Sequence, residues 1–444
     1  MNTPLPKVVH PVAGRPMIER VVRAVKASGA TEVRVVVGFG ESLVRQIVEP
    51  MGSICFKQEK QNGTADAVRS AQPDSLTGDV VILNGDHPLM EADDIAKFFK
   101  AFRDSEAGLA VVTCELENPG SFGRVVRRQD KVVAIVEAKD ASHETLKVRE
   151  INTGIYVVKA EVLNKLLPNI QNQNKQGEYY LTDLVGLAIE AGIKVEGLKA
   201  DPRIAMGVNT QAELALATKQ AFERKAQRLM ELGVIMLDPT TAFIEDTAEV
   251  APGAVLYPNV YLRGKARIGA MAVIEPGCVI TDSTIGEGVH MKAGCYVTES
   301  SVGHQVQMGP YAHLRPGTEI GDEAHVGNFV EMKKVKFGKG AKANHLTYLG
   351  DAEIGENTNI GCGTITCNYA ADRKKYVTKI GKDCFIGSDT QFIAPVSVGD
   401  GAYVGSGSTI TKDVPSGSLA VARSKQIIKE NYIPRAPEQS KKEK

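Results

Sequence analysis

Residues 250–284 read VAPGAVLYPNVYLRGKARIGAMAVIEPGCVITDST, and an aliphatic residue recurs there at every sixth position. Four positions after each comes a small or β-branched residue, and the same pattern returns over residues 380–414. A period of six fits neither a helix nor a lone strand, and it is typical of the hexapeptide repeat of a parallel β-helix. The recurring positions are Val250, Leu256, Leu262, Ile268, Ile274 and Ile280, and then Ile380, Ile386, Phe392, Val398, Val404 and Ile410.

Each hexapeptide is expected to form one flat side and one turn of a prism, with its aliphatic residue inside and like residues stacked in successive coils. The six-residue register breaks around residues 285–350 and again at 366–380. Breaks in a solenoid indicate insertions that leave one face as loops. These breaks contain Arg315, Lys333, His345 and Tyr348, and we therefore expect the chemistry of this half to lie on loops.

Residues 1–209 follow a different pattern, in which short apolar runs alternate with helical patterns. The runs at 33–37, 80–83, 109–114 and 155–158 predict buried strands, and residues 18–27 and 94–102 predict helices. This alternation predicts a doubly wound α/β domain with a largely parallel sheet, which binds ligands at the carboxyl ends of its strands. We further predict a helical linker at 210–233, the β-helix domain at 234–430 and a disordered tail at 431–444.

The composition excludes several classes of partner and site. The 444 residues include 53 basic and 53 acidic side chains, so no net charge steers the chain to nucleic acid or to an anionic membrane. The seven cysteines are odd in number and include no Cys-x-x-Cys pair, which argues against a zinc site or a disulfide framework. No apolar stretch approaches the roughly 18 residues of a membrane span. We expect a cytoplasmic protein.

Four motifs carry a family resemblance. Residues 326–334 (VGNFVEMKK), 344–351 (NHLTYLGD), 360–369 (IGCGTITCNY) and 387–391 (GSDTQ) resemble the bifunctional N-acetylglucosamine-1-phosphate uridylyltransferase/glucosamine-1-phosphate N-acetyltransferase family. The resemblance runs from Leu5 to Arg423. It implies a left-handed β-helix that forms a homotrimer, active sites between neighbouring subunits, and a place in UDP-N-acetylglucosamine synthesis, which feeds peptidoglycan and lipopolysaccharide precursors.

Acetyl transfer to an amine needs a base, and His345 suits this role because a free imidazole is largely neutral at cellular pH. The resemblance places the catalytic base at this residue. Arg315 offers a planar fork for a phosphate, and Lys333 adds a point charge. The resemblance implies that the hexosamine phosphate is bound by Arg315, Lys333, Tyr348 and Asn359, and acetyl-CoA by Cys362, Asn368, Tyr369, Ser388, Ser406 and Arg423. The family commonly has alanine at positions 362 and 406.

In the first half, Asp86 follows the predicted strand at 80–83, and Asn209 supplies a second oxygen. A carboxylate and an amide oxygen suit Mg²⁺, and the resemblance implies that these two residues hold it. UTP is the implied co-substrate. The resemblance also implies residues that bind UDP-N-acetylglucosamine. Lys7 contacts a phosphate, and the uridine nucleotide is bound by Gln58, Gly63 and Thr64. The N-acetylhexosamine is bound by Gly123, Glu137 and Asn152, and Asn209 belongs to this binding site as well as to the metal site.

The family begins with a strand and a Leu-Ala-Ala-Gly-x-Gly-Thr-Arg-Met loop that cradles the triphosphate, whereas this sequence begins where that loop ends. Either the start codon is assigned too late, or the domain is truncated and uridylyl transfer is impaired. We expect the chain as written to transfer acetyl groups far better than uridylyl groups. Three alternatives stay open: an acetyltransferase only, a single-activity sugar-1-phosphate nucleotidyltransferase with an inert solenoid, and a non-enzymatic solenoid scaffold.

Overall fold

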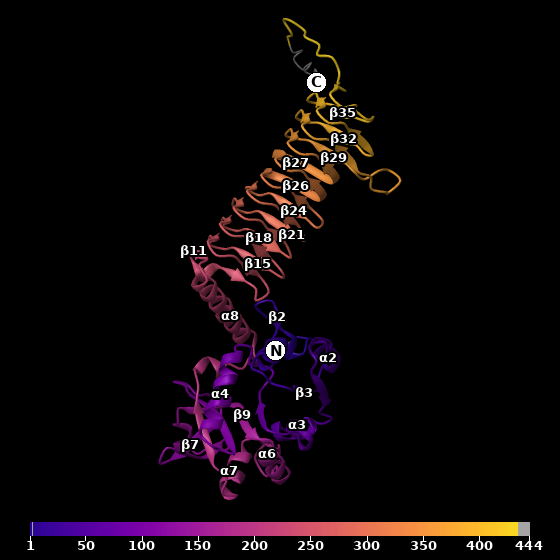
Figure 1. Ribbon diagram of the computed structural model, residues 1–444. Coiled ribbons are helices and arrows are strands. Elements are labelled where there is room, and N and C mark those ends of the chain that lie inside the picture. Colours follow the sequence, from indigo (N-terminus) through magenta and orange to yellow (C-terminus); the bar gives the residue numbers. More distant parts are fainter. Residues whose placement is uncertain (2, 434–444) are drawn as a thin grey trace, which may run out of the picture. The chain divides into compact units, whose positions relative to one another are not determined.

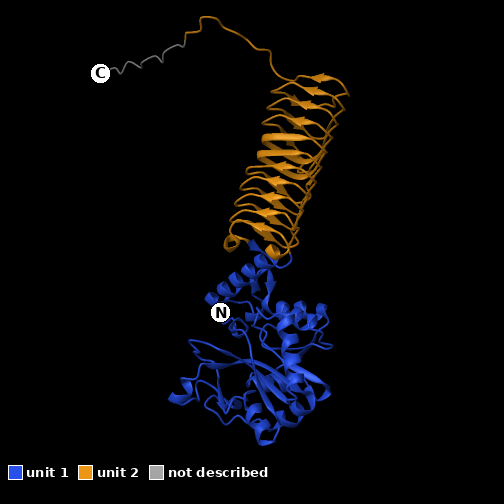
Figure 2. Ribbon diagram, turned by 60° about the vertical axis from the view of Figure 1, so that its left-hand side comes forward, with its two compact units in different colours: residues 1–228, 243–247 blue, residues 229–242, 248–444 orange. Residues whose placement is uncertain are grey.

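The computed structural model describes residues 1 and 3–433. The chain divides into two compact units (Figure 2), of which unit 1 comprises residues 1–228 and 243–247, and unit 2 comprises 229–242 and the residues from 248 onward. Helix α8 (Gln211–Glu231) occupies the predicted linker. Residues 434–444 of the predicted tail lie outside the described part. Among the described residues, no helix combines the length and the apolar character that crossing a membrane would require.

Unit 1 is an α/β domain built on a six-stranded sheet (Figure 1). The strand order is β10-β6-β9-β7-β8, and β5 pairs with β9. A separate pair consists of β3 (Arg34–Val37) and β4 (Ile54–Lys57). The sheet strands are β5 (Asp79–Ile82), β6 (Leu109–Glu115), β7 (Arg124–Arg128), β8 (Lys131–Val136), β9 (Glu150–Lys159) and β10 (Val195–Lys199).

The direction of β9 departs from the expected largely parallel sheet. It runs antiparallel to both β5 and β6, although β10 and β6 are parallel. The chain passes from β6 through β7 and β8 to β9 with no helix other than the four-residue α5 (His143–Leu146). A parallel connection usually needs a longer crossover helix, and its absence here accounts for the antiparallel pairing.

Alternate residues of the sheet enter two apolar cores. Ala110, Val112 and Val157 pack in one core with α1 (Met17–Ala27) and α4 (Ala92–Asp104). Leu109, Val111 and Val158 pack in the other with α6 (Ala160–Leu166) and α7 (Asp183–Glu190). This period-two division shows that the sheet is covered on both faces. Helix α2 spans Glu41–Val48, and α3 spans Thr64–Ser70.

Unit 2 is a β-helix whose parallel strands run from β11 (Ile235–Met236) to β36 (Leu419–Ala420). All twelve recurring residues of the six-residue pattern are at most 8% exposed, so they form the interior of the prism as predicted. Most strands have two or three residues, but β26 (His325–Phe337) and β27 (Lys342–Ile354) each have 13. The strands that carry the site also include β24 (His313–Arg315), β28 (Asn359–Ile360), β29 (Ile365–Cys367) and β30 (Thr378–Ile380).

The two predicted breaks differ in kind. Over 285–350 the prediction of loops is wrong, because Ile268 pairs with Ile285, 17 residues later, and parallel pairing continues through β26 and β27. Coils shortened by one residue shift the sequence register but leave the prism intact. At 366–380 an insertion is present, since Ile354 pairs with Ile380, 26 residues later. The additional residues form the loop between β29 and β30 (Figure 1).

Candidate functional site

His345 lies at a corner of the prism, in one column with three predicted acetyl-CoA residues. The pairing of β27 with β28, β31 (Phe385–Ile386) and β34 (Tyr403–Val404) sets this register through Ala343, Ile360, Ile386 and Val404. The coils are joined at this corner by bonds from Asp389 N to Cys362 O (2.7 Å) and from Gly407 N to Ser388 O (2.8 Å). The positions two residues after the paired ones are therefore stacked: His345, Cys362, Ser388 and Ser406.

Glycines allow the coils to approach closely beside this corner column. A Cβ at Gly361 would lie 2.5 Å from the backbone nitrogen of Ser388, and one at Gly387 would lie 2.4 Å from that of Ser406. The Arg423 side chain lies beside the column, with its Cδ 3.8 Å from where a Cβ of Gly407 would be. Cys362 is exposed. The corner thus presents small groups and one cation to solvent.

The imidazole of His345 is held by one neighbour. Its Nδ1 lies 2.8 Å from Oδ1 of Asn328, the residue opposite it on β26. Because an amide oxygen only accepts, the contact favours the tautomer with the proton on Nδ1, and in the neutral imidazole Nε2 then keeps its lone pair. Phe329 and Leu346, the residues that follow this pair, have positive φ angles of 56° and 34° and exposures of 56% and 62%. Bulky residues rarely adopt this conformation.

A cluster of cations lies on the flat face between this corner and the next. Arg315 pairs in register with Lys333 of the adjacent coil, and its Nη1 donates to Glu331 Oε1 at 2.8 Å. Glu331 raises the pKa of Arg315. The pKa of Lys333 is lowered, chiefly by the neighbouring Lys375. Three cations therefore gather here. Lys375 was not predicted as a site residue, and only its place in the 366–380 insertion pointed to it.

Tyr348 and Asn368 converge near the same face. A Cβ at Gly350 would lie 2.5 Å from the Tyr348 hydroxyl and 2.8 Å from Asn368 Nδ2, so both side chains close over the glycine. Asn368 is buried and donates to Asp351, whereas Tyr369 is 61% exposed and forms a β-bridge with Lys375. The loop at 366–380 thus brings two predicted acetyl-CoA residues to the cations.

Asn359 is not brought to this cluster. It lies on a different flat face, where it pairs with Lys342 and Phe385. His345 is also apart from the cations, because Asn328 precedes Lys333 by five residues on β26. At roughly 3.3 Å per extended residue, the base and the cations are separated by at most about 16 Å along one strand. One chain therefore places the base and the cations at opposite edges of one face.

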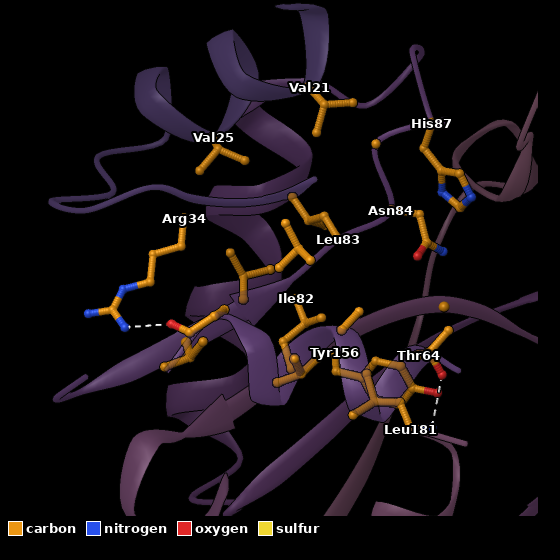
Figure 3. Close-up of a pocket in the computed structure, with 18 of the residues that line it drawn as sticks. Val21, Val25, Arg34, Thr64, Ile82, Leu83, Asn84, His87, Tyr156 and Leu181 are labelled. Atoms are coloured by element: carbon orange, nitrogen blue, oxygen red, sulfur yellow. Dashed lines mark hydrogen bonds between the residues drawn. The ribbon is translucent and has the colours of Figure 1, made fainter. Parts of the chain in front are cut away.

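In unit 1, most of the predicted nucleotide residues line one cavity of about 1300 Å³. Figure 3 shows Thr64, Asn84, His87, Tyr156 and Leu181 around it. Asn84 and His87 were not predicted, although they flank Asp86 in the sequence. Lys7 and Gly63 do not line the cavity themselves, but the residues that follow them, Val8 and Thr64, do. The predicted residues that line it are Gln58, Thr64, Asp86, Gly123, Glu137, Asn152 and Asn209.

Two predicted metal ligands share a cation in the structure. The Lys7 ammonium lies 2.5 Å from Asp86 Oδ2 and 2.8 Å from Asn209 Oδ1. The other carboxylate oxygen of Asp86 is buried and has no hydrogen-bond partner among the described residues. His87 Nε2 lies 3.6 Å from this oxygen. The Asp86 carboxylate and the Asn209 amide oxygen are hard donors of the kind that Mg²⁺ binds, but they supply only part of an octahedral ligand set.

The segment around Gly63 and Thr64 is shaped by its contact with Tyr179. Gly63 has a φ of 117°, and a Cβ there would lie 2.6 Å from the Tyr179 carbonyl oxygen. Thr64 Oγ1 accepts from Leu181 N at 3.0 Å, and Gln58 Nε2 donates to Asp66 Oδ2 at 2.8 Å. Only glycine therefore fits at position 63, and the helix α3 begins next to it.

The three predicted sugar residues also lie together. Asn152 N donates to Gly123 O at 2.9 Å, and Asn152 Nδ2 donates to the Tyr156 hydroxyl at 2.9 Å. A Cβ at Gly123 would lie 3.3 Å from Glu137 Oε1. Burial raises the pKa of Glu137, and a hydrogen bond with Thr182 opposes this effect. The pocket wall thus combines an amide, a carboxyl group and a glycine.

Comparison with known proteins decides the family. The bifunctional protein GlmU of Bdellovibrio bacteriovorus is 60% identical over 443 residues, which span all of this chain and 97% of that protein. The chain belongs to the bifunctional GlmU family. The GlmU protein of Geobacter metallireducens is 44% identical over 97% of this chain and 95% of its own length. The GlmU protein of Carboxydothermus hydrogenoformans is 42% identical over 98% of this chain and 97% of its own length.

Three domain descriptions match parts of this GlmU family member. Residues 1–147 match the MobA-like NTP transferase domain, and 239–337 match the GMPPB C-terminal domain. Residues 378–412 match the bacterial transferase hexapeptide repeats. The chain is therefore an enzyme with the two GlmU activities, acetyl transfer and uridylyl transfer, and the scaffold and single-activity alternatives are set aside.

Proposed function

We propose that His345 is the general base with which this GlmU family member acetylates glucosamine 1-phosphate. The observation that carries the proposal is the Asn328 contact, which leaves Nε2 as the acceptor. The substrate amine attacks the thioester carbonyl of acetyl-CoA and gives up a proton to Nε2. Coenzyme A leaves as its thiol after taking up that proton. N-acetylglucosamine 1-phosphate is the product.

Arg315 and Lys333 bind the sugar phosphate in this proposal, together with Tyr348 and Asn359. The stacked pair of cations supports it, since a dianion is well matched by a fork and a point charge. Acetyl-CoA lies along the corner column of Cys362, Ser388 and Ser406, with Arg423 beside it. Asn368 and Tyr369 complete the site from the loop.

We propose that the active enzyme is a homotrimer with sites shared between neighbours. The amine and the phosphate are on adjacent ring carbons of the substrate, yet within one chain the base and the cations lie at opposite edges of a face, up to about 16 Å apart along the strand. A base from one chain and cations from the next would close this distance. Asn359, which lies on a different face from Arg315, would likewise reach the site from a neighbouring chain.

Unit 1 is proposed to transfer the uridylyl group. The phosphate oxygen of N-acetylglucosamine 1-phosphate attacks the α-phosphate of UTP in line and expels pyrophosphate. Lys7 neutralises phosphate charge, while Gln58, Gly63 and Thr64 hold the nucleotide and Gly123, Glu137 and Asn152 hold the sugar. Asp86 and Asn209 would hold Mg²⁺, which when bound supplies further charge neutralisation. Both reactions draw on cytoplasmic co-substrates and lead to UDP-N-acetylglucosamine for the cell wall.

The test is to measure both activities of His345→Ala. Thiol release from acetyl-CoA with glucosamine 1-phosphate is expected to fall by about 10²–10⁴-fold, the range for loss of a general base. Pyrophosphate release with UTP should equal that of the unchanged chain, since the residue lies in unit 2. Near-normal thiol release by a variant of unchanged oligomeric state would remove His345 from the mechanism.

A further inference from the structure

Three polar side chains lie on successive coils of the β-helix at one corner. Asn328 of β26 pairs in register with His345 of β27 (Figure 1), and Nδ1 of the imidazole lies 2.8 Å from the Asn328 side-chain oxygen. Cys362 occupies the same position on the next coil, because Ala343 pairs with Ile360 two residues earlier. Each of the three therefore follows the one before it by 17 residues. We call Asn328, His345 and Cys362 the corner triad.

The coils that carry His345 and Cys362 are in direct contact at this corner. Gly363 N donates to Leu346 O at 2.9 Å, immediately after the two triad residues. Neighbouring strands of a sheet lie roughly 4.7–4.9 Å apart, and the Cα atoms of His345 and Cys362 are separated by about that distance. Both residues are exposed. A thiol and an imidazole thus stand next to each other on one solvent-facing edge.

The order of the three groups is the one that activates a thiol. A thiol attacks a carbonyl carbon as its thiolate, and an adjacent imidazole can take its proton. A third group orients the base, as Asn328 does through its contact with Nδ1, which favours the tautomer with the lone pair on Nε2. Cysteine, histidine and asparagine in these three roles recur in unrelated thiol enzymes. The corner triad therefore contains the parts of a nucleophilic site.

The surroundings of the corner triad indicate which electrophile reaches the thiol. The column continues from Cys362 to Ser388 and Ser406 on the following coils. The Arg423 side chain adds a cation beside it. An edge of small groups with a cation at its end suits an elongated anionic molecule, and acetyl-CoA has this form. In the proposed function, on which this inference rests, the thioester carbonyl lies within reach of His345 and hence of its neighbour Cys362.

We propose that Cys362 is a second acetyl acceptor, which forms S-acetyl-Cys362 from acetyl-CoA when no amino sugar occupies the site. Nε2 of His345 takes the thiol proton, and Sγ of Cys362 attacks the thioester carbonyl. A new C–S bond to Cys362 forms, the C–S bond to coenzyme A breaks, and the proton moves to the departing sulfur. One thioester replaces another, so the step needs no oxidant and is reversed by free coenzyme A. The chain thereby exchanges acetyl groups between acetyl-CoA and free coenzyme A.

The first test incubates the full chain with acetyl-CoA alone, without glucosamine 1-phosphate. After an acid quench and peptic digestion, fragment-ion mass spectrometry should locate an acetyl group on Cys362. Neutral hydroxylamine should remove this group, because hydroxylamine cleaves thioesters and leaves acetyl-lysine intact. Cys367, which is partly buried and lies outside the corner column, is the internal control and should stay unmodified.

The second test follows isotope exchange, a kinetic sign of a covalent acyl-enzyme. Labelled free coenzyme A should enter acetyl-CoA at least about tenfold faster with the unchanged chain than with Cys362→Ala or His345→Ala. Cys362→Ala introduces the residue that the family commonly has there, so the fold should be kept, and Cys367→Ala is the matched control that should exchange normally. Raising the pH should restore exchange in His345→Ala but not in Cys362→Ala, because hydroxide can replace a lost base but not a lost nucleophile.

Two results would overturn the inference. The first is the absence of an acetyl group on Cys362 in a preparation that acetylates glucosamine 1-phosphate, and this result would leave the proposed function standing. The second is exchange by Cys362→Ala at the rate of the unchanged chain, which would assign the exchange to another group. Failure of the proposed function is read separately, because His345→Ala would then acetylate glucosamine 1-phosphate at a normal rate.

Discussion

The side-chain oxygen of Asn328 lies 2.8 Å from Nδ1 of His345, and the two residues sit opposite each other on adjacent coils. The contact fixes the tautomer and the ring orientation of the proposed base. We predict that Asn328→Ala lowers kcat for acetyl transfer by roughly tenfold, about 1.4 kcal/mol of transition-state stabilisation. The KM for glucosamine 1-phosphate should change little, because Asn328 makes no proposed contact with the sugar.

Lys336→Ala is the matched control, since Lys336 is an exposed residue of the same strand on another face. It should leave both kinetic parameters unchanged. Long-range ¹⁵N–¹H spectra of the imidazole provide a second readout. Asn328→Ala should yield a mixture of His345 tautomers, whereas the unchanged chain should show one. A single tautomer in both proteins would assign Asn328 a role in packing alone.

The separation of base and cations predicts complementation between two inactive variants. His345→Ala and Lys333→Ala should each transfer acetyl groups poorly as pure proteins. Co-expressed in equal amounts they should assemble into mixed trimers, in which about a quarter of the shared sites combine an intact base with an intact lysine. Thiol release is the measurement, and mixing the purified proteins without subunit exchange is the control. A co-expressed sample no more active than the pure variants would show that each chain builds its site alone.

The six-residue period sufficed to predict the β-helix, because every coil repeats the same local requirement for a buried aliphatic residue. The same period misled at residues 285–350, since a one-residue deletion at a corner changes the sequence register without altering the strand pairing. Asn328 and Lys375 were missed for a related reason. Their contacts join coils that are 17 or more residues apart in the sequence. A single Asn or Lys that belongs to no recognised motif position does not reveal a partner at that distance. The direction of β9 was missed because an apolar run does not encode strand polarity.

Exposure of the cysteines predicts selective alkylation. Cys362 is exposed and lies in the corner column, whereas Cys114 is buried and burial raises its pKa to about 11. Iodoacetamide at pH 8 should modify the exposed Cys362 well before the buried Cys114, because the thiolate is the nucleophile. Acetyl-CoA should slow modification of Cys362, as followed by peptide mass spectrometry. Cys362→Ala should keep acetyl transfer and lose its sensitivity to the reagent, and inhibition of that variant at the same rate would place the sensitive thiol elsewhere.

Glu137 links the pH dependence of stability to the proposed sugar site. Burial raises the pKa of this carboxyl group above its ordinary value of 4.5, so the native state holds more protons than the unfolded state between these two values. The free energy of unfolding must then decrease as pH rises through that window. Glu137→Gln should accordingly stabilise unit 1 at pH 7, and this gain should vanish as pH falls below the ordinary value. Urea unfolding followed by circular dichroism measures the difference, with the exposed Glu144→Gln as the control. The same variant should bind N-acetylglucosamine 1-phosphate more weakly, because Glu137 is proposed to hold the sugar and a buried carboxyl group kept for binding lowers stability. A stability gain that persists unchanged at pH 4 would show that it arises from packing and not from the buried charge.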